Sequence, residues 1–134
     1  VKTSQEKQAW LTAHHPDSHP AVVALDDSGT VAGWAGISPW SPRQAYARTA
    51  ESSVYVHPSH HRTGLGRRLM NELIETARQR TAVRVFIARI VVPAPGSIGL
   101  HESLGYRPIG TMRRCGEKFG RILDVLLMEL HLDE

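Results

Sequence analysis

Residues 61–68 place two glycines among several arginines, a combination that suits the binding of an anion. The segment reads His61-Arg62-Thr63-Gly64-Leu65-Gly66-Arg67-Arg68. Glycines let a ligand approach the backbone closely, and the first turn of a following helix leaves N–H groups without intrahelical partners. Those donors, together with the arginine charges, predict a site for a phosphate or a diphosphate. The residues alone leave one alternative open, a plain strand-turn-helix with a basic start.

The glycine spacing differs from two common nucleotide-binding motifs. A P-loop needs Gly-Lys-Ser or Gly-Lys-Thr after the turn, and a dinucleotide fingerprint needs a third glycine where this chain has Leu69. The strand before the turn should end near Val56, because Pro58 cannot continue a sheet ladder. The helix after it should cover about residues 64–80, since the apolar residues there recur at helical spacing.

Before the turn, the chain predicts one helix and three strands. The helix is expected over residues 4–14, with Ser4 as its N-cap. Two strands over residues 21–25 and 30–37 should form a hairpin. This hairpin should pack beside the strand that starts near Arg48 and leads into the turn.

After the turn, the chain predicts a strand, a short helix and two more strands. The strand is expected over residues 83–92, and the helix over residues 97–104, where Gly105 ends it. The last two strands should cover residues 106–114 and 122–132, around a turn-rich segment at residues 115–120. This order predicts an α/β fold with a mixed, twisted sheet and flanking helices.

Length and composition indicate a single globular domain over residues 1–134, of which 41% are hydrophobic. The sequence contains no run of about 18 apolar residues and no charged-then-apolar leader, so we expect neither a membrane span nor an export signal. The single cysteine, Cys115, excludes an internal disulfide and favours the cytoplasm.

Two binding classes are disfavoured by the pattern of residues. The net charge of +3 and the recurring arginines would suit nucleic acid, but the aromatic residues form no stripe interleaved with basic ones. A bound polyphosphate cofactor together with ordinary solvated charge explains the arginines more simply. The eight histidines are scattered and have no cysteine partner, so we expect no metal site.

The strand, glycine turn and helix resemble the acyl-CoA-binding motif of the GNAT N-acetyltransferase superfamily. In that motif, a turn of pattern Gln/Arg-x-x-Gly-x-Gly/Ala holds the diphosphate of coenzyme A. His61 stands at the first position here and can still supply its backbone amide. The resemblance implies acetyl-CoA as co-substrate. The cofactor-binding residues that it implies are Val54, Tyr55, Val56, His61, Arg62, Thr63, Gly64, Leu65, Gly66 and Arg67.

Four further blocks are similar to the phosphinothricin acetyltransferase family. They comprise residues 43–56, 97–106, 110–113 and 118–125, and with the turn they cover nearly the whole chain. The resemblance implies transfer of an acetyl group from acetyl-CoA to the amino group of a small amino acid analogue, such as phosphinothricin, methionine sulfone or methionine sulfoximine. It implies direct attack by the amine, and a homodimer.

The chain departs from these families at three places. Ala94 replaces an asparagine that binds the cofactor in many superfamily members. His101 replaces a tyrosine that can protonate the leaving thiolate, although phosphinothricin-type relatives also carry histidine there. Relatives usually begin with a further strand and helix that help to shape the acceptor pocket, and this sequence starts at what would be the second helix.

The implied reaction needs a proton acceptor, because an amine is protonated at neutral pH. Glu51 is the candidate base, acting directly or through one water; its alternative role is to pair with an arginine such as Arg43. A backbone N–H near Val54 or Tyr55 should polarise the thioester carbonyl, a contribution of roughly 3 kcal/mol. His101 is either the proton donor to the thiolate or a hydrogen-bonded structural residue.

An anionic acceptor would find basic and polar side chains at two places. Arg43 and Tyr46 precede the strand that leads to the turn, while Lys118 and Arg121 lie near the last hairpin. The alternative for all of them is solvent-facing polarity. Besides the acetyltransferase, two hypotheses stay open: a non-catalytic CoA-binding or interaction domain, and a basic nucleic-acid binder.

Overall fold

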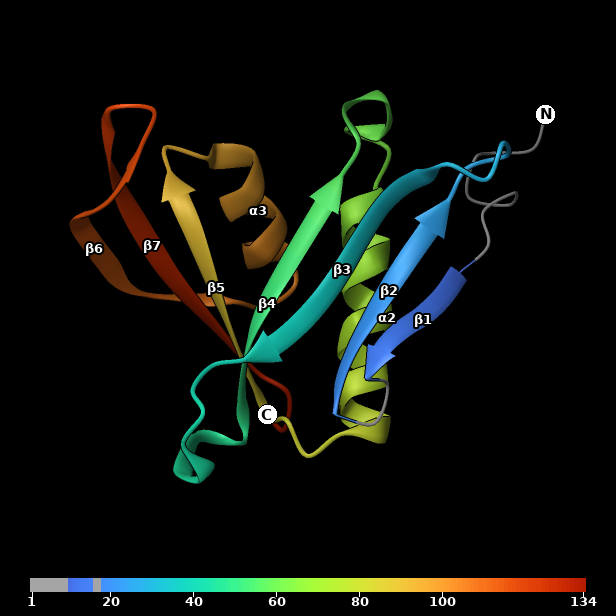
Figure 1. Cartoon of the computed structure of the whole chain (residues 1–134), viewed down its shortest axis with the longest axis horizontal. Coiled ribbons are helices and arrows are strands. Elements are labelled where there is room, and N and C mark those ends of the chain that lie inside the picture. The colour runs from blue at the N-terminus through green and yellow to red at the C-terminus, as the bar shows by residue number, and fades with distance from the viewer. Residues whose placement is uncertain (1–9, 16–17) are drawn as a thin grey trace.

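The structure, a computed structural model, describes residues 10–15 and 18–134, and a single mixed sheet runs through them (Figure 1). The elements are β1 (Trp10–His15), β2 (His19–Leu25), β3 (Val31–Pro39), β4 (Thr49–Val56), α2 (Leu65–Arg80), β5 (Val85–Val92), α3 (Pro95–Ser103), β6 (Arg107–Lys118) and β7 (Arg121–His131), with short 3₁₀ turns at Gln44–Tyr46 and Pro58–His60.

The strands of the sheet follow the order β1-β2-β3-β4-β5-β7-β6. Every neighbouring pair is antiparallel except β4 and β5, which are parallel. A parallel pair needs a crossover connection, and α2 provides it. The prediction of a mixed α/β sheet with flanking helices is therefore confirmed.

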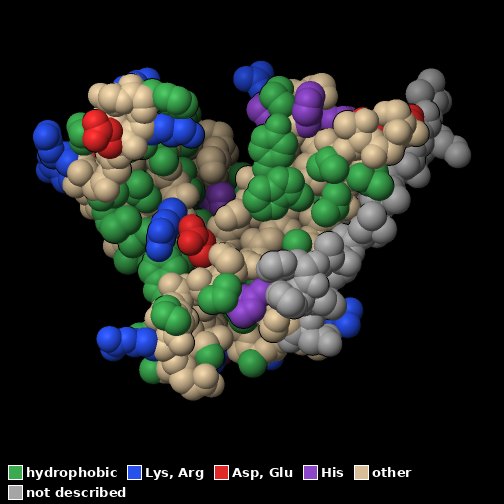
Figure 2. Space-filling model, viewed as in Figure 1, with side chains coloured by type: hydrophobic (Ala, Val, Ile, Leu, Met, Phe, Trp, Pro, Cys, Tyr) green, Lys and Arg blue, Asp and Glu red, His purple; other side chains and the backbone are tan. Residues whose placement is uncertain are grey.

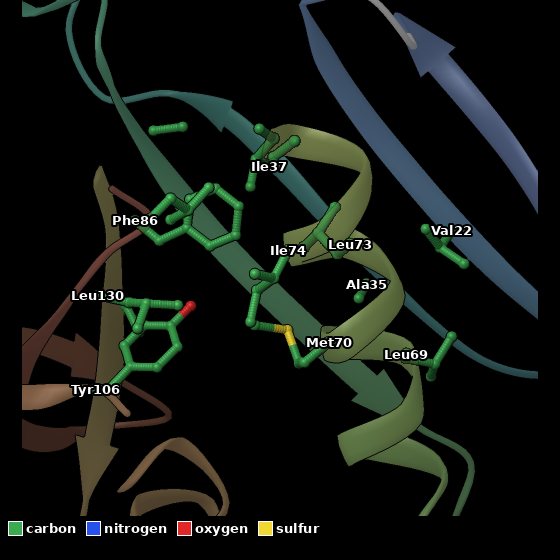
Figure 3. Close-up of a cluster of buried hydrophobic side chains, with 14 of the residues drawn as sticks. Val22, Ala35, Ile37, Leu69, Met70, Leu73, Ile74, Phe86, Tyr106 and Leu130 are labelled. Carbon is green, nitrogen blue, oxygen red and sulfur yellow. The ribbon is translucent and has the colours of Figure 1, made fainter. Parts of the chain in front are cut away.

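Helix α2 covers β2, β3 and β4 on one face of the sheet. Its residues Leu69, Met70, Leu73 and Ile74 are buried against the sheet, as Figure 3 shows. The helix can lie close to the sheet because of Gly33, where a Cβ atom would stand only 3.0 Å from the side chain of Leu69 on α2. Within the part of the chain that the structure describes, no helix is both long and apolar enough to cross a membrane.

The hairpin before the glycine turn is confirmed, and β3 pairs with β4 as expected. The helix predicted over residues 4–14 is wrong from Trp10 onward, because β1 occupies that segment and pairs with β2. Residues 4–9 lie outside the described ranges. The backbone groups that β2 offers along its edge decide the conformation there, and local helix propensity does not reveal them.

Two boundaries near the C-terminus also differ from the prediction. Helix α3 starts at Pro95, two residues before the predicted start, and Gly105 follows its end with a φ of +100°. The turn-rich segment predicted at 115–120 is wrong, since β6 continues to Lys118. Only Phe119 and Gly120 form the turn, both with positive φ, as tight two-residue hairpins require.

Candidate functional site

Strands β4 and β5 run together for only three residue pairs and then separate. Pairing stops at Glu51 opposite Ile87, and the two strands diverge beyond it (Figure 1). Figure 2 shows the molecule hollowed between its two halves. We call this space the wedge. It holds a cavity of about 350 Å³ lined by Ser52, Ser53, Val54, Ala88, Arg89, Ile90, Val91, Ala94, Ser97 and His101.

The main chain of Val54 faces the wedge. In the β3–β4 ladder the amide of Trp40 donates to the carbonyl of Thr49, and the amide of His57 donates to the carbonyl of Ala32. Hydrogen-bonded pairs in an antiparallel ladder alternate, so the odd-numbered residues of β4 bond to β3 and the even-numbered ones face β5. Since β5 no longer pairs with β4 beyond Glu51, the amide and carbonyl of Val54 have no partner on a neighbouring strand.

Tyr55 points away from the wedge. Its main chain belongs to the set that bonds β3, and its exposed ring stacks on Trp34 with centroids 6.5 Å apart. Of the two residues expected near the thioester carbonyl, Val54 is therefore the one whose amide faces the space between the strands.

The glycine turn ends at a helix N-terminus that no side chain caps. Gly64 is the N-cap of α2, with φ of +80° and no side-chain hydrogen bond to the first turn. The amides of Leu65, Gly66 and Arg67 therefore have no intrahelical acceptor. A Cβ atom on Gly64 would meet nothing within 4 Å, so the space beside the turn is open. These donors suit the diphosphate that the sequence predicts.

Most of the other polar groups of the glycine turn form hydrogen bonds within the protein, whereas Arg62 is exposed. The ring Nε2 of His61 donates to the carbonyl of Val56 at 2.9 Å, and its amide donates to the carbonyl of Pro58, so the expected use of that amide on a ligand is not supported. Thr63 bonds the carbonyl of His60, and the guanidinium of Arg67 bonds the carbonyl of Ser103. Arg62 is exposed on the turn, with φ of +64°.

The turn is held against α3 by close packing at Gly66. A Cβ atom there would lie 3.3 Å from Leu100 and 3.4 Å from Val56. The first turn of α2, the end of β4 and helix α3 therefore meet at one edge of the wedge. This contact places the uncapped amides at that edge of the wedge.

Glu51 stands at the apex of the wedge, in the last residue pair that β4 shares with β5. Its neighbours Ala50 and Ser52 are buried on the face that α2 covers, so Glu51 points to the opposite face. Its carboxylate lies 3.8 Å from Nε of Arg89, with 28% of the Glu51 side chain exposed. The partner is thus Arg89 and not Arg43, and the carboxylate stays accessible.

On the helix side of the wedge, three polar side chains form a buried group. The hydroxyls of Ser52 and Tyr106 are 2.8 Å apart, which joins β4 to the segment after α3. The rings of Tyr106 and His101 pack edge to face with centroids 4.8 Å apart. Burial raises the pKa of Tyr106 far above its ordinary value, so its phenol stays protonated.

His101 is neutral and carries its proton on Nδ1. That atom lies 2.8 Å from the carbonyl oxygen of Ser97, which can only accept, so Nδ1 donates. Burial lowers the pKa of His101 below its ordinary value, although the bond to Ser97 opposes this effect. In this tautomer Nε2 has no proton to give. The geometry therefore favours the structural role of His101 over donation to a thiolate.

Replacing His101 should change how stability depends on pH. Because the pKa of His101 is lower in the folded protein, the unfolded chain binds more protons as pH falls below about 6.5, and stability is lost there. We expect His101→Asn to cost roughly 1 to 2 kcal/mol at pH 7.5 and to lose less further stability than wild type between pH 7.5 and pH 5. Urea denaturation at both pH values measures this, and equal losses would contradict the assignment.

The expected acceptor-binding residues do not form one cluster. Arg43 and Tyr46 are exposed beside the 3₁₀ turn that precedes β4, at the end of the sheet opposite the glycine turn (Figure 1). Lys118 lies at the tip of the β6–β7 hairpin, where its ammonium stands 5.5 Å from the ring centre of Phe119. Lys118 is therefore separated from the other two along the sheet.

Sequence reasoning missed Arg89 and Trp40. The guanidinium carbon of Arg89 lies 4.8 Å from the ring centre of Trp40, beside Glu51. The only signal was that Arg89 interrupts the apolar run of residues 85–92, where a charge is unexpected in a buried strand. Among residues 18–134, no three or more His, Cys, Asp or Glu side chains are grouped so that they could hold a metal ion.

Comparison with known proteins gives concordant matches. The sequence model of the Acetyltransferase (GNAT) family matches residues 2–106. An L-methionine sulfoximine/L-methionine sulfone acetyltransferase of Pseudomonas paraeruginosa is 41% identical, over 95% of this chain and 73% of that protein. A phosphinothricin N-acetyltransferase of Streptomyces viridochromogenes is 39% identical, over 90% of this chain and 66% of that protein. An acetyltransferase structure from Salmonella typhimurium with its cofactor acetyl-CoA has a TM-score of 0.80 at 41% identity, covering 87% of this chain and 66% of that one.

Proposed function

Since the chain belongs to the GNAT acetyltransferase family, we propose that it moves an acetyl group from acetyl-CoA to the amino group of a small amino acid analogue. The observation that carries the proposal is the wedge. It brings together an uncapped helix N-terminus, an unpaired strand edge at Val54 and the accessible carboxylate of Glu51.

The residues around the wedge fit acetyl-CoA. The amides of Leu65, Gly66 and Arg67 would hold the diphosphate, with the charge of Arg62 nearby. Val54 would pair with the amides of the pantetheine arm, like a strand added to an open edge. Val56 offers only its amide there, because His61 already occupies its carbonyl. Bound in this way, acetyl-CoA would supply a thioester as the acetyl donor.

The side chains and main chain at the apex would then perform two tasks. Glu51 would take a proton from the acceptor amine, directly or through one water, so that the nitrogen can attack. The amide of Val54 would polarise the thioester carbonyl, since it points into the space between the strands. The C–S bond of the thioester would then break, and coenzyme A would leave as a thiolate that takes a proton from solvent, so no covalent bond to the enzyme is needed.

The acceptor is proposed to be a compound of the phosphinothricin, methionine sulfone or methionine sulfoximine type. The names of two relatives support this class. Arg43 and Tyr46 are proposed to contact the acceptor from the loop before β4. The alternative, a CoA-binding domain without activity, is not favoured, because these relatives are acetyltransferases.

An assay of thiol release from acetyl-CoA tests the proposal. Release should rise on addition of L-methionine sulfone, L-methionine sulfoximine or phosphinothricin, and mass spectrometry should find the N-acetyl product. If acetyl-CoA raises the melting temperature while no amine in the panel stimulates release, the non-catalytic domain would be the better description.

We further propose a homodimer that works in the cytoplasm. Strand β6 is an exposed edge of the sheet, and Ile109, Met112 and Ile122 on the β6–β7 hairpin are exposed apolar residues. The exposed thiol of Cys115 fits a reducing compartment. Sedimentation equilibrium would report the mass of a dimer, and a monomer at micromolar concentration would refute the first part.

A further inference from the structure

Arg89 is an exposed cation inside the cavity. It lies on β5 two residues beyond the last pair with β4 and lines the wedge. Its neighbours Ala88 and Ile90 are buried on the helix side, so Arg89 points to the same face as Glu51. With 49% of its side chain exposed, it can meet a ligand that approaches from that face.

The guanidinium of Arg89 is held in place by its neighbours, but part of its hydrogen-bonding capacity remains available. It stacks over Trp40 at 4.8 Å, and its Nε faces Glu51 at 3.8 Å, a distance that is long for a charge-assisted hydrogen bond. Among residues 18–134, the two Nη atoms have no hydrogen-bond partner. A planar guanidinium with an occupied face and a free edge is suited to bidentate binding of a carboxylate.

The charges of Glu51 and Arg89 form the complement of a zwitterion. An α-amino acid carries its ammonium and its carboxylate on one carbon atom, and here an anion and a cation lie side by side at the apex of the wedge. An amine placed at Glu51 for deprotonation would bring its own carboxylate next to Arg89. An amine that has no neighbouring anionic group would leave the positive charge of Arg89 without a partner on the acceptor.

We propose that Arg89 binds the carboxylate of the acceptor and thereby selects α-amino acids over amines that lack this group. The inference rests on the proposed function, because it concerns the acceptor of that reaction. It assigns Arg89 a role in specificity, with Trp40 as the residue that positions its guanidinium. Arg43 and Tyr46 remain available for the far end of the acceptor.

The test compares two acceptors that differ only in the group Arg89 would bind: L-methionine sulfone and its α-carboxamide. Wild type should prefer the acid by about 10-fold or more in kcat/KM, the size expected of a charge-assisted pair. In Arg89→Met this preference should fall by about 10-fold or more relative to wild type at the same pH, mainly through a higher KM for the acid. Arg89→Lys should retain part of it, and the KM for acetyl-CoA should not change.

Arg107→Met is the matched control, since Arg107 forms a surface ion pair with Glu134 at 3.3 Å outside the wedge. It should keep the wild-type preference. If Arg89→Met lowers the rates with the acid and the amide equally, Arg89 only supports Glu51 and the inference is wrong. Should Arg89→Met fail to fold, Arg89→Lys with an unreduced preference would overturn it as well. A wild-type protein that acetylates no amine would instead refute the proposed function, and the inference with it.

Discussion

Glu51→Gln should lower kcat by roughly 10²- to 10⁴-fold, the range that a positioned general base contributes. Glutamine keeps the shape of the side chain at the apex of the wedge but cannot accept a proton. The KM for acetyl-CoA should stay within about two-fold, because Glu51 lies at the apex of the wedge, away from the uncapped amides of the glycine turn. Steady-state thiol release with L-methionine sulfone measures both quantities.

The loss should depend on pH. An acceptor amine with a pKa of about 9 to 10 becomes neutral without help at high pH, so the deficit of Glu51→Gln should shrink there. Glu75→Gln serves as the control, because Glu75 also faces an arginine, Arg78, at 3.9 Å but lies on the exposed side of α2. A deficit that stays constant from pH 7 to pH 10 would indicate that Glu51 only holds Arg89.

Gly64→Val should abolish the stabilisation of the protein by acetyl-CoA. Valine is strained at a φ of +80°, and its side chain would fill the open space beside the uncapped amides. Loss of two or more hydrogen bonds to a charged diphosphate should weaken binding by about 100-fold or more. At a ligand concentration about 100 times Kd, wild type should gain roughly 5 to 15 °C in melting temperature, and the variant almost none.

Gly29→Val is the control that distinguishes the effect of backbone strain from the loss of the diphosphate site. Gly29 has nearly the same φ, +81°, and equally open surroundings, but it lies in the turn between β2 and β3. Both variants should melt at a lower temperature without ligand, and only Gly64→Val should fail to respond to acetyl-CoA. An undiminished thermal shift in Gly64→Val would mean that the glycine turn is not the diphosphate site.

Local sequence was sufficient where neighbouring residues decide the conformation. Gly64 adopts the left-handed conformation that glycine permits, and α2 starts at Leu65, within one residue of the predicted start. The β2–β3 hairpin turns at Asp26–Gly29, where the Asp26 carboxylate accepts from the amides of Ser28 and Thr30. These features depend on short-range contacts, and sequence patterns record short-range contacts directly.

Sequence patterns predicted the wrong secondary structure where pairing with a strand distant in the chain determines the conformation. Trp10–His15 form β1 because β2 offers a free edge, and residues 115–118 extend β6 because β7 lies beside them. The main-chain amides of Tyr55 and His61 are directed at protein acceptors for a related reason. Which way a main-chain amide points depends on the register with β3 and on the 3₁₀ turn before His61, and neither can be counted along the chain.

The sequence by itself determined that an anion-binding turn joins a strand to a helix, because the glycines, the arginines and the apolar spacing all act within a few residues. Only the tertiary structure decided that β4 and β5 separate after Glu51, and that Arg89 and Trp40 stand beside this carboxylate. It also fixed the proton of His101 on Nδ1. Strand pairing brings these residues together across long stretches of chain, and their chemistry follows from the distances and the burial that this pairing sets.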